Sequence, residues 1–255
     1  MSKLKNNKRT ILKVFAALIA FVLIGGLIFF TNAFVGNPIS AMIANRAIEK
    51  YVGKYYPYLD LEVEKAIYNF KTGSYMARAW SKTSIDTKFN IYYYRGDIRD
   101  DYESSVLGKY NTLYRLSDEY SVIARNIIAE KLGYENNTTI VIYEMDDEAK
   151  DILQLDMEFD KSLPLDSEVL IRVDLEDISI EEVAKVLVDA HKAFVEDNCN
   201  FTEYSLFAEE DGTHISIHGV TPKDIEGGEL VDLLKEAKDN EGDSRIYVFI
   251  KEADK

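Results

Sequence analysis

The stretch KVFAALIAFVLIGGLIFFTNA, residues 13–33, decides how the rest of this chain is placed. Residues 14–30 are 17 consecutive positions without a charged or strongly polar side chain, and residues 31–35 extend this weakly polar run to 22. At a rise of ~1.5 Å per residue such a helix spans about 25–33 Å, which matches a hydrocarbon core of ~30 Å. The stretch therefore predicts a transmembrane helix over residues 14–35, with the lipid bilayer as its partner.

The length of the run also indicates whether it is cleaved. The apolar region of a secretory signal is usually only ~7–15 residues long, so the longer run favours a signal anchor that stays in the membrane. Thr31, Asn32 and Ala33 form a tolerable small-residue cleavage site, which leaves removal of residues 1–33 as the alternative.

A cluster of basic residues precedes the apolar run of residues 14–35, and no such cluster follows it. Residues 1–13 contain no acid and carry five basic side chains, Lys3, Lys5, Lys8, Arg9 and Lys13. By the positive-inside rule, residues 1–13 form a cytoplasmic tail and residues 34–255 lie outside the cytoplasm. The sequence thus predicts a single-pass protein of the cell membrane with extracytoplasmic domains.

Charge is distributed unevenly along the 255 residues, whose net charge is −15. Residues 34–145 hold 14 basic and 14 acidic side chains, whereas residues 146–255 hold 31 acids against 11 bases. An acidic body repels phosphate backbones, so we expect no nucleic-acid partner. Cys199 is the only cysteine and forms no intrachain disulfide, so we expect it as a small buried apolar side chain.

Residues 36–135 predict a small α+β module. Asn37 is suited to cap a helix that begins at Pro38 and stops before Pro57. Three strand-like runs follow, at residues 61–71, 75–82 and 87–96, and indicate an antiparallel meander against that helix. Apolar residues return to helical spacing over residues 100–131, where Gly108 is a possible break between two helices.

Residues 136–165 are expected as a connection containing one strand, and residues 166–255 as an acidic second module. Its elements read strand, helix, strand, strand, helix, strand, with a tight hairpin at Asp211 and Gly212. This is the order of the split βαβ, or ferredoxin-like, fold. The predicted fold class is therefore α+β, with one transmembrane helix, a helix-plus-meander module and a ferredoxin-like βαββαβ module.

Period-two alternation sorts the strands of the second module into two faces. One face is apolar and is expected to meet the helices through Val169, Ile171, Val173, Ile215, Ile217, Ile246, Val248 and Ile250. The other face carries Leu170 and Ser216 and the candidate binding residues Arg172, His214, His218, Tyr247 and Phe249. Packing of this face against the first module is the alternative to ligand binding.

No catalytic, cofactor or metal motif stands out. The chain lacks GxSxG, HExxH and P-loop patterns, so we predict no catalytic residue and no cofactor. His214 and His218 lie ~13 Å apart on a strand, too far to share one ion. Asp156, Glu158 and Asp160 begin like a calcium loop, but Lys161 and Ser167 stand where Gly and Glu are needed.

Several segments together resemble one known family. They are FVGNPI, KYYPYLDLEVEKAIYNFKTGSYMARAWSKTSIDTKFNIYYYRGDIRDDY and NTLYRLSDEY. Over about residues 34–130 the chain resembles the YfjL-like family of membrane-anchored Bacillota proteins. The resemblance implies the anchored topology and carries no reaction with it.

The expected function is a non-catalytic binding or scaffolding component of the cell envelope, with an unknown envelope protein or ligand as partner. An envelope hydrolase built on dispersed carboxylates is one alternative. A protease-inhibitor-like module, which requires an exposed wedge at the turn of Thr72 and Gly73, is another.

Overall fold

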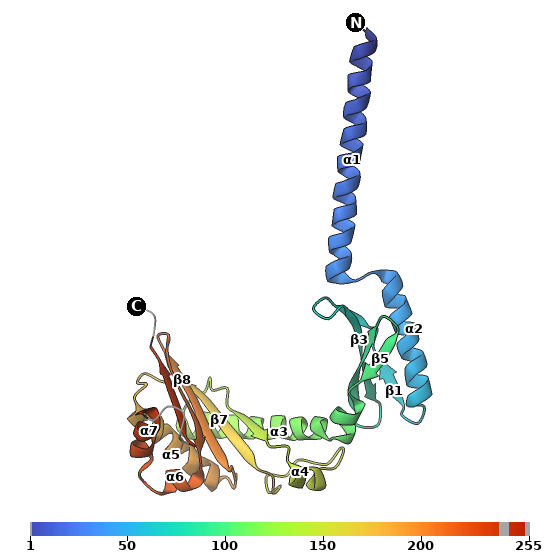
Figure 1. Ribbon diagram of the computed structural model, residues 1–255. Coiled ribbons are helices and arrows are strands. Elements are labelled where there is room, and N and C mark those ends of the chain that lie inside the picture. The colour runs from blue at the N-terminus through green and yellow to red at the C-terminus, as the bar shows by residue number, and fades with distance from the viewer. Residues whose placement is uncertain (1, 240–244, 253–255) are drawn as a thin grey trace. The chain divides into compact units, whose positions relative to one another are not determined.

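The computed structural model describes residues 2–239 and 245–252. The chain divides into two compact units, Met1–Leu107 and Gly108–Lys255. The first unit contains the long helix α1, Ser2–Val35, and the second ends in strand β10, Tyr247–Lys251 (Figure 1). Both units mix helices with a sheet, which agrees with the expected α+β class.

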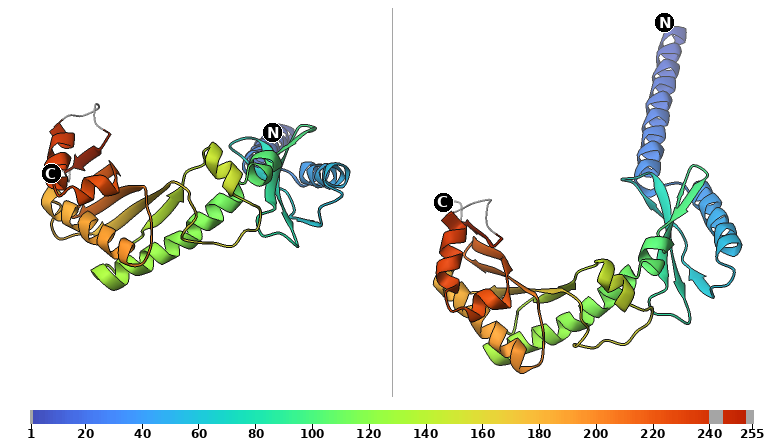
Figure 2. Two further views of the ribbon diagram at one scale, coloured as in Figure 1. Left: turned by 90° about the horizontal axis from the view of Figure 1, so that it is seen from below. Right: turned by 60° about the horizontal axis from the view of Figure 1, so that its bottom comes forward.

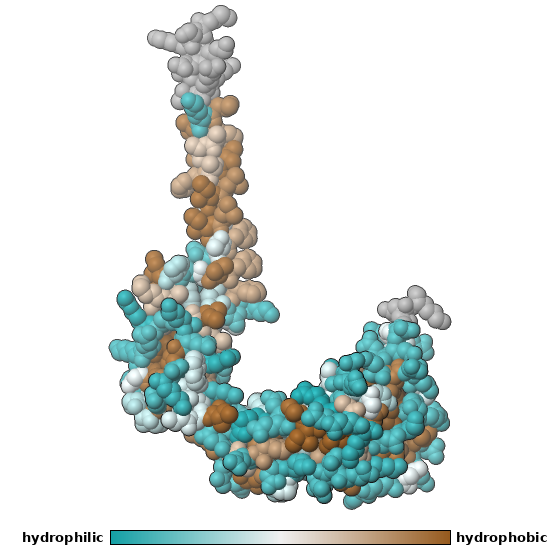
Figure 3. Space-filling view, turned by 180° about the vertical axis from the view of Figure 1, so that it is seen from behind, coloured by the Kyte–Doolittle hydropathy of each residue, from teal (hydrophilic) through white to brown (hydrophobic). Residues whose placement is uncertain are grey.

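Helix α1 is apolar and has no protein packed around it over most of its length. Its most apolar window has a mean hydropathy of 2.7 and no buried residue. Figure 3 shows this apolar surface along the shaft of the helix. By its length and composition, α1 is long and apolar enough to cross a membrane.

At the junction after α1, the main chain packs closely against two tyrosine side chains. Gly36 has a φ of +73°, and a Cβ there would lie 2.7 Å from Tyr68 Cγ and 2.7 Å from the Tyr75 hydroxyl oxygen. Helix α2, Pro38–Tyr55, follows at once, and Asn37 caps it by accepting a hydrogen bond of 2.8 Å from the Ser40 N–H. The expected N-cap and the proline at the first helical position are thus confirmed.

The sheet of the first unit is antiparallel and has five strands, two more than expected. Strands β3, Ser74–Ser81, and β4, Lys88–Tyr94, form its centre, and β4 also pairs with β5, Asp97–Asp100. The run predicted as one strand over residues 61–71 is two short strands, β1, Leu61–Val63, and β2, Ile67–Asn69, which both pair with β3.

The core of the first unit lies between α2 and this sheet. Its buried members are Ile48, Tyr56, Ala77, Ala79, Phe89, Ile91 and Val106. The Tyr56 ring packs on Phe89 at 5.0 Å and on Tyr102 at 4.9 Å between centroids. A short π-helical turn, Glu103–Leu107, then ends the unit. The main chain breaks at Gly108 as expected, because Lys109 adopts a left-handed conformation with a φ of 62°.

Helix α3, Tyr110–Leu132, belongs to the second unit, although residues up to 135 were expected in the first. It packs along strand β6, Ile140–Tyr143, which was expected in a connection. Two hydrogen bonds join α3 to β6. The Ser121 hydroxyl accepts one from the Val141 N–H at 2.7 Å, and the Ser117 hydroxyl accepts one from the Tyr143 N–H at 3.1 Å.

The second sheet has the order β10-β9-β8-β7-β6. Its remaining strands are β7, Ser167–Asp174, β8, Glu203–Glu210, and β9, Thr213–Val220. The helices between them are α4, Asp147–Ile152, α5, Ile180–Glu196, α6, Pro222–Glu226, and α7, Leu230–Asp239. Figures 1 and 2 show α3, α5 and α7 gathered over one face of this sheet.

The strand order corrects the expected ferredoxin-like arrangement. In a split βαβ unit another strand lies between the two parallel strands, whereas here β7 and β8 pair directly and in parallel. Strand β6 occupies the other side of β7, so no later strand can pair there. Linear element order is compatible with both topologies, so only the pairing distinguishes them.

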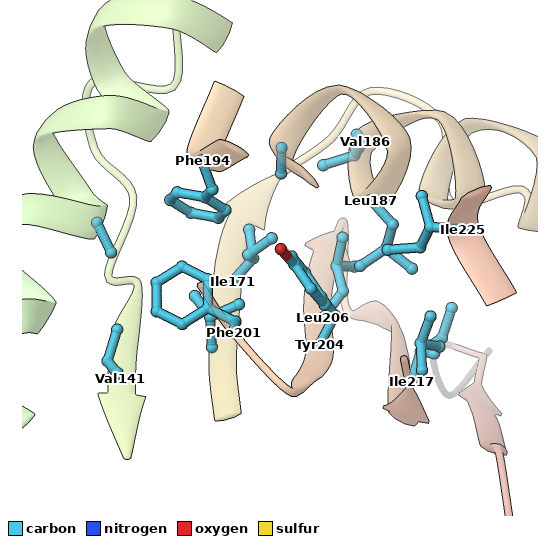
Figure 4. Packing of buried hydrophobic residues seen from close by; sticks show 14 of the residues in the cluster. Val141, Ile171, Val186, Leu187, Phe194, Phe201, Tyr204, Leu206, Ile217 and Ile225 are labelled. Atoms are coloured by element: carbon cyan, nitrogen blue, oxygen red, sulfur yellow. The ribbon is translucent and has the colours of Figure 1, made fainter. Parts of the chain in front are cut away.

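The core of the second unit confirms the predicted apolar face. Val169, Ile171, Val173, Ile215, Ile217, Ile246 and Val248 are buried, and Ile250 is half-buried against them. Phe194 on α5 meets Phe201 edge to face at 4.9 Å, and Tyr204 lies beside them (Figure 4). The expected hairpin is also present, since Asp211 and Gly212 both have positive φ values of 45° and 80°.

Candidate functional site

The face of the second sheet away from its helices carries all five candidate residues. The register places Tyr247 opposite His218, and both Phe249 and Phe207 opposite Ser216. Arg172 on β7 lies opposite Phe207 on β8. The side chains therefore form continuous rows across four strands, because residues at matching register positions point to the same face.

Phe207 contacts two of the candidate residues, His214 and Arg172. Its ring stacks on the His214 imidazole at 5.6 Å between centroids with an interplanar angle of 29°. The Arg172 guanidinium carbon lies 5.0 Å from the centroid of the same ring, in cation–π geometry. Phe249 completes the row at 6.0 Å from the His214 ring. Sequence reasoning missed Phe207, although alternation along β8 places it on this face with Ser205.

The apolar surface extends to the opposite edge strand. Ile140 and Ile142 on β6 are 37% and 45% exposed, and Ile140 lies opposite Leu170. At the other edge Tyr247 and Phe249 are 49% and 40% exposed. Ile140 and Ile142 were not predicted because β6 was assigned to a connection. No signal in the sequence marks this face, because the four residues of β6, IVIY, are all apolar and do not alternate.

Acidic side chains flank the apolar centre at both ends of the strands. Glu168 lies opposite Glu203 at one end, and Asp174 opposite Glu209 at the other. Alternation puts all four on the same face as Arg172. We call the whole surface the open face, defined by Ile140, Ile142, Leu170, Arg172, Phe207, His214, His218, Tyr247 and Phe249 with these four acids.

Each ring nitrogen of His218 lies within hydrogen-bond distance of a serine hydroxyl. Ser205 Oγ lies 3.0 Å from Nδ1, and Ser216 Oγ lies 2.8 Å from Nε2. A Glu168 carboxylate oxygen is 3.9 Å from Nδ1. The contact between Ser216 and His218 has the reach of a nucleophile and its base. However, β9 is paired on both sides, so its N–H groups are used in the sheet rather than free to stabilise an oxyanion.

A pocket of about 380 Å³ lies on the far side of the second unit, between α3 and α5. Two of its three acids form ion pairs with lysines: Lys185 Nζ is 3.0 Å from Glu182, and Lys131 Nζ is 3.1 Å from Glu196. Asp189 is a further seven residues along α5 from Glu182, which is a rise of about 10 Å. The pocket does not bring two free carboxylates together, as a glycosidase-like hydrolase requires.

The third histidine and the cysteine are structural. His191 is buried, with Nδ1 2.9 Å from the Tyr204 hydroxyl and Nε2 3.3 Å from Glu226. Cys199 is buried as expected, and burial raises the pKa of its thiol. Within residues 2–239 and 245–252, no group of three or more His, Cys, Asp or Glu side chains is placed to hold a metal ion.

The fold and the open face define a two-unit α+β protein that follows one long apolar helix and carries an aromatic sheet face in its second unit. Comparison with protein families matches residues 11–102 to the YfjL-like N-terminal domain and residues 119–235 to the YfjL-like C-terminal domain. The chain belongs to the YfjL-like family. Comparisons with curated proteins and with solved structures found no significant match.

Proposed function

We propose that this protein is a membrane-anchored component of the cell envelope, in which α1 holds both units outside the cytoplasm and the open face binds a protein partner without catalysis. The apolar length of α1 and the basic residues that precede it support the anchored, N-in topology. The single observation that carries the binding role is the open face.

An open sheet face of this composition is unusual for a surface that meets only water. Solvated faces of antiparallel sheets are typically polar, whereas this one exposes two aromatic rings and two isoleucines. Contiguous apolar surface rimmed by polar groups marks interaction sites. Tyr247, Phe249 and Arg172 are also of the residue types that dominate the binding energy of protein interfaces.

The rim indicates the chemistry of the partner. Four acids flank the apolar centre, within a region of the chain where acids far outnumber bases. We therefore propose a polypeptide segment whose apolar side chains cover the centre and whose Lys or Arg side chains face the rim. Such complementarity raises the association rate and makes binding sensitive to salt.

Site-specific photo-crosslinking in native membranes tests this proposal. A benzophenone amino acid at position 249 should give one discrete adduct with another protein, and the Tyr247→Ala change should remove most of it. The matched control is position 195 on α5, where Val195 is also exposed but faces away from the open face. An adduct at both positions, an adduct only with the first unit of the same chain, or none at all would contradict the proposal.

The folding control uses the double variant Tyr247→Ala, Phe249→Ala. Because both rings are largely exposed, we expect the loss of stability to stay near ~1 kcal/mol or below, as for other surface changes. Urea unfolding followed by circular dichroism measures this. Loss of folding would show that the rings belong to the core rather than to a binding surface.

Hydrolysis is the second candidate, favoured by the 2.8 Å contact between Ser216 and His218. A fluorophosphonate probe reacts with an activated serine and leaves an ordinary one unmodified. Under our proposal Ser216 stays unmodified, and the Ser216→Ala variant gives the same mass as the wild type after correction for the substitution. Modification at Ser216 would establish the hydrolase instead.

A further inference from the structure

Two turns of the first sheet lie beside the end of α1. Residues 70–73 connect β2 to β3, and residues 95–96 connect β4 to β5, so both turns are at the same end of the sheet. The Phe70 ring packs against Phe34 of α1 at 5.7 Å between centroids. A pocket of about 260 Å³ at this end is lined by Asn32 of α1, Ile43 of α2 and Arg95 of the second turn.

We propose that this end of the first unit lies on the outer surface of the membrane, with Lys71 and Arg95 bound to the phosphates of lipid headgroups. This inference rests on the proposed function, because it requires that α1 spans the bilayer. We call the surface the anchor end and define it by Phe34, Ile39, Ile43, Phe70, Lys71, Tyr94 and Arg95.

Depth supports the proposal first. Phe34 is the penultimate residue of α1 and lies at the end of the apolar run, where a spanning helix reaches the headgroup region. Since the Phe70 ring is 5.7 Å from that of Phe34, the first turn lies at nearly the same depth. A bilayer that solvates α1 up to Val35 therefore also meets residues 70–73.

The apolar side chains of the anchor end support it second. Ile39, Ile43, Phe70 and Tyr94 are all exposed around the base of α1. Phe70 is 53% exposed, although it is the largest apolar side chain of its turn. Aromatic residues gather at membrane interfaces because one part of the ring meets hydrocarbon and another meets water. Continuity with α1 identifies lipid as the material that covers them.

Charge supports it third. The two turns contribute two exposed cations, Lys71 and Arg95, against one exposed acid, Asp97, which directly follows the second turn. The Arg95 guanidinium carbon lies 5.2 Å from the Tyr94 ring centroid, so the arginine side chain packs over an aromatic ring. Long basic side chains at this depth extend their charges towards lipid phosphates while their carbon chains stay in apolar surroundings.

Backbone geometry at Arg95 is consistent with a role for its side chain. Arg95 and Gly96 have φ values of 49° and 103°, as a two-residue hairpin turn requires. Asn, Asp or Gly normally fills the first of these positions. The turn geometry alone therefore does not account for an arginine at this position.

The same placement bears on the inhibitor alternative. Thr72 and Gly73 belong to the first turn, and Gly73 lines the pocket beside α1. A turn that lies in the headgroup layer is shielded from soluble proteases by the membrane. The anchor end therefore cannot act as the exposed wedge that a protease inhibitor needs.

Quenching of a single tryptophan by lipids brominated near the ester carbonyl tests the proposal on the full chain in vesicles. Trp80 is the only native tryptophan, so the reporters are placed in a Trp80→Phe background. Phe70→Trp reports on the anchor end. Ile85→Trp is the matched control, because Ile85 is 65% exposed in the turn at the opposite end of the sheet. Phe29→Trp reports on α1 itself.

We expect several-fold more quenching at position 70 than at position 85 in vesicles that contain phosphatidylglycerol. Lys71→Gln with Arg95→Gln should reduce the quenching at position 70 to the level seen in pure phosphatidylcholine. Equal quenching at positions 70 and 85, with strong quenching at position 29, would overturn this inference and leave the anchor intact. No quenching at position 29 would overturn both, and quenching at position 70 that ignores lipid charge and both substitutions would refute the phosphate contacts.

Discussion

At the residue scale, two positions order the first unit: Gly36 joins α1 to the sheet, and Asp100 joins α2 to it. Gly36 fits between Tyr68 and Tyr75, where no larger residue has room. Asp100 accepts hydrogen bonds of 2.7 Å from both Tyr51 and Tyr56 through one carboxylate oxygen. The two hydrogen bonds of Asp100 join residues 49 and 44 positions apart, so they determine the tertiary structure rather than local conformation.

Replacement of Gly36 tests the junction. Gly36→Ala combines a strained positive φ with a Cβ overlap on two rings, and we expect a loss of about 1–3 kcal/mol in the free energy of unfolding. Urea unfolding of the full chain in detergent measures it. The control is Gly53→Ala within α2, which meets no atom within 4 Å and should be neutral or stabilising. Equal effects of both changes would contradict the packing described for Gly36.

The tyrosine pair predicts loss of stability in alkali. Burial, followed by the hydrogen bond to Asp100, raises the pKa of Tyr51 from 10.0 to about 12. Between these values the unfolded chain loses the proton while the folded chain keeps it, so stability falls as pH rises. We expect Tyr51→Phe to make this fall shallower, as measured by urea midpoints across that range. Tyr114→Phe, at an exposed position of α3, should leave the fall unchanged.

At the scale of elements, helix α3 closes one edge of the second sheet. An edge strand leaves a row of backbone N–H groups unpaired, which invites pairing with other chains. On β6 two of these groups, those of Val141 and Tyr143, donate to the serines of α3. Strand β10 forms the other edge of this sheet and carries the two exposed rings of the open face.

Ser121→Ala tests this closure. The change leaves the buried Val141 N–H without its acceptor, and an unsatisfied buried donor costs about 1–3 kcal/mol. Urea unfolding followed by circular dichroism gives the value. Ser104→Ala removes a hydroxyl that donates to the main chain at an exposed site, so its effect should stay within ~0.5 kcal/mol. A Ser121→Ala protein as stable as the wild type would show that α3 does not satisfy β6.

Periodicity predicted most elements but not their pairing. The Asn37 cap, the Asp211 hairpin and the alternation in β7, β9 and β10 are local signals, and the structure confirms them. Strand β5 was missed because its four residues, DIRD, are mostly charged. The placement of α3 and the direct pairing of β7 with β8 depend on contacts distant in sequence, which no local pattern contains.

The same limit applied to the open face. Alternation placed Arg172, His214, His218, Tyr247 and Phe249 on one side of the sheet, and the register brings them together. Phe207 was missed although alternation along β8 places it on this face, whereas finding Ile140 and Ile142 required knowing that β6 joins the same sheet. That this face binds a partner stays a prediction.

At the scale of the whole molecule, both proposed roles depend on α1 remaining in the membrane. The sequence contains a basic tail, an apolar helix and an acidic C-terminal region. The two family domains match residues 11–102 and 119–235. If α1 spans the membrane, the open face meets envelope proteins and the anchor end meets lipid. If α1 is removed, neither role remains in the form proposed.

Labelling of introduced cysteines in intact cells with a membrane-impermeant maleimide tests this most directly. Cys199 is buried with a raised thiol pKa, so we expect little background from the native chain. Ile85→Cys should be labelled and Ser2→Cys should not, and the mass of the labelled chain should include residues 1–33. Labelling at Ser2→Cys, protection at Ile85→Cys, or a labelled chain that begins near Phe34 would contradict the tethered topology.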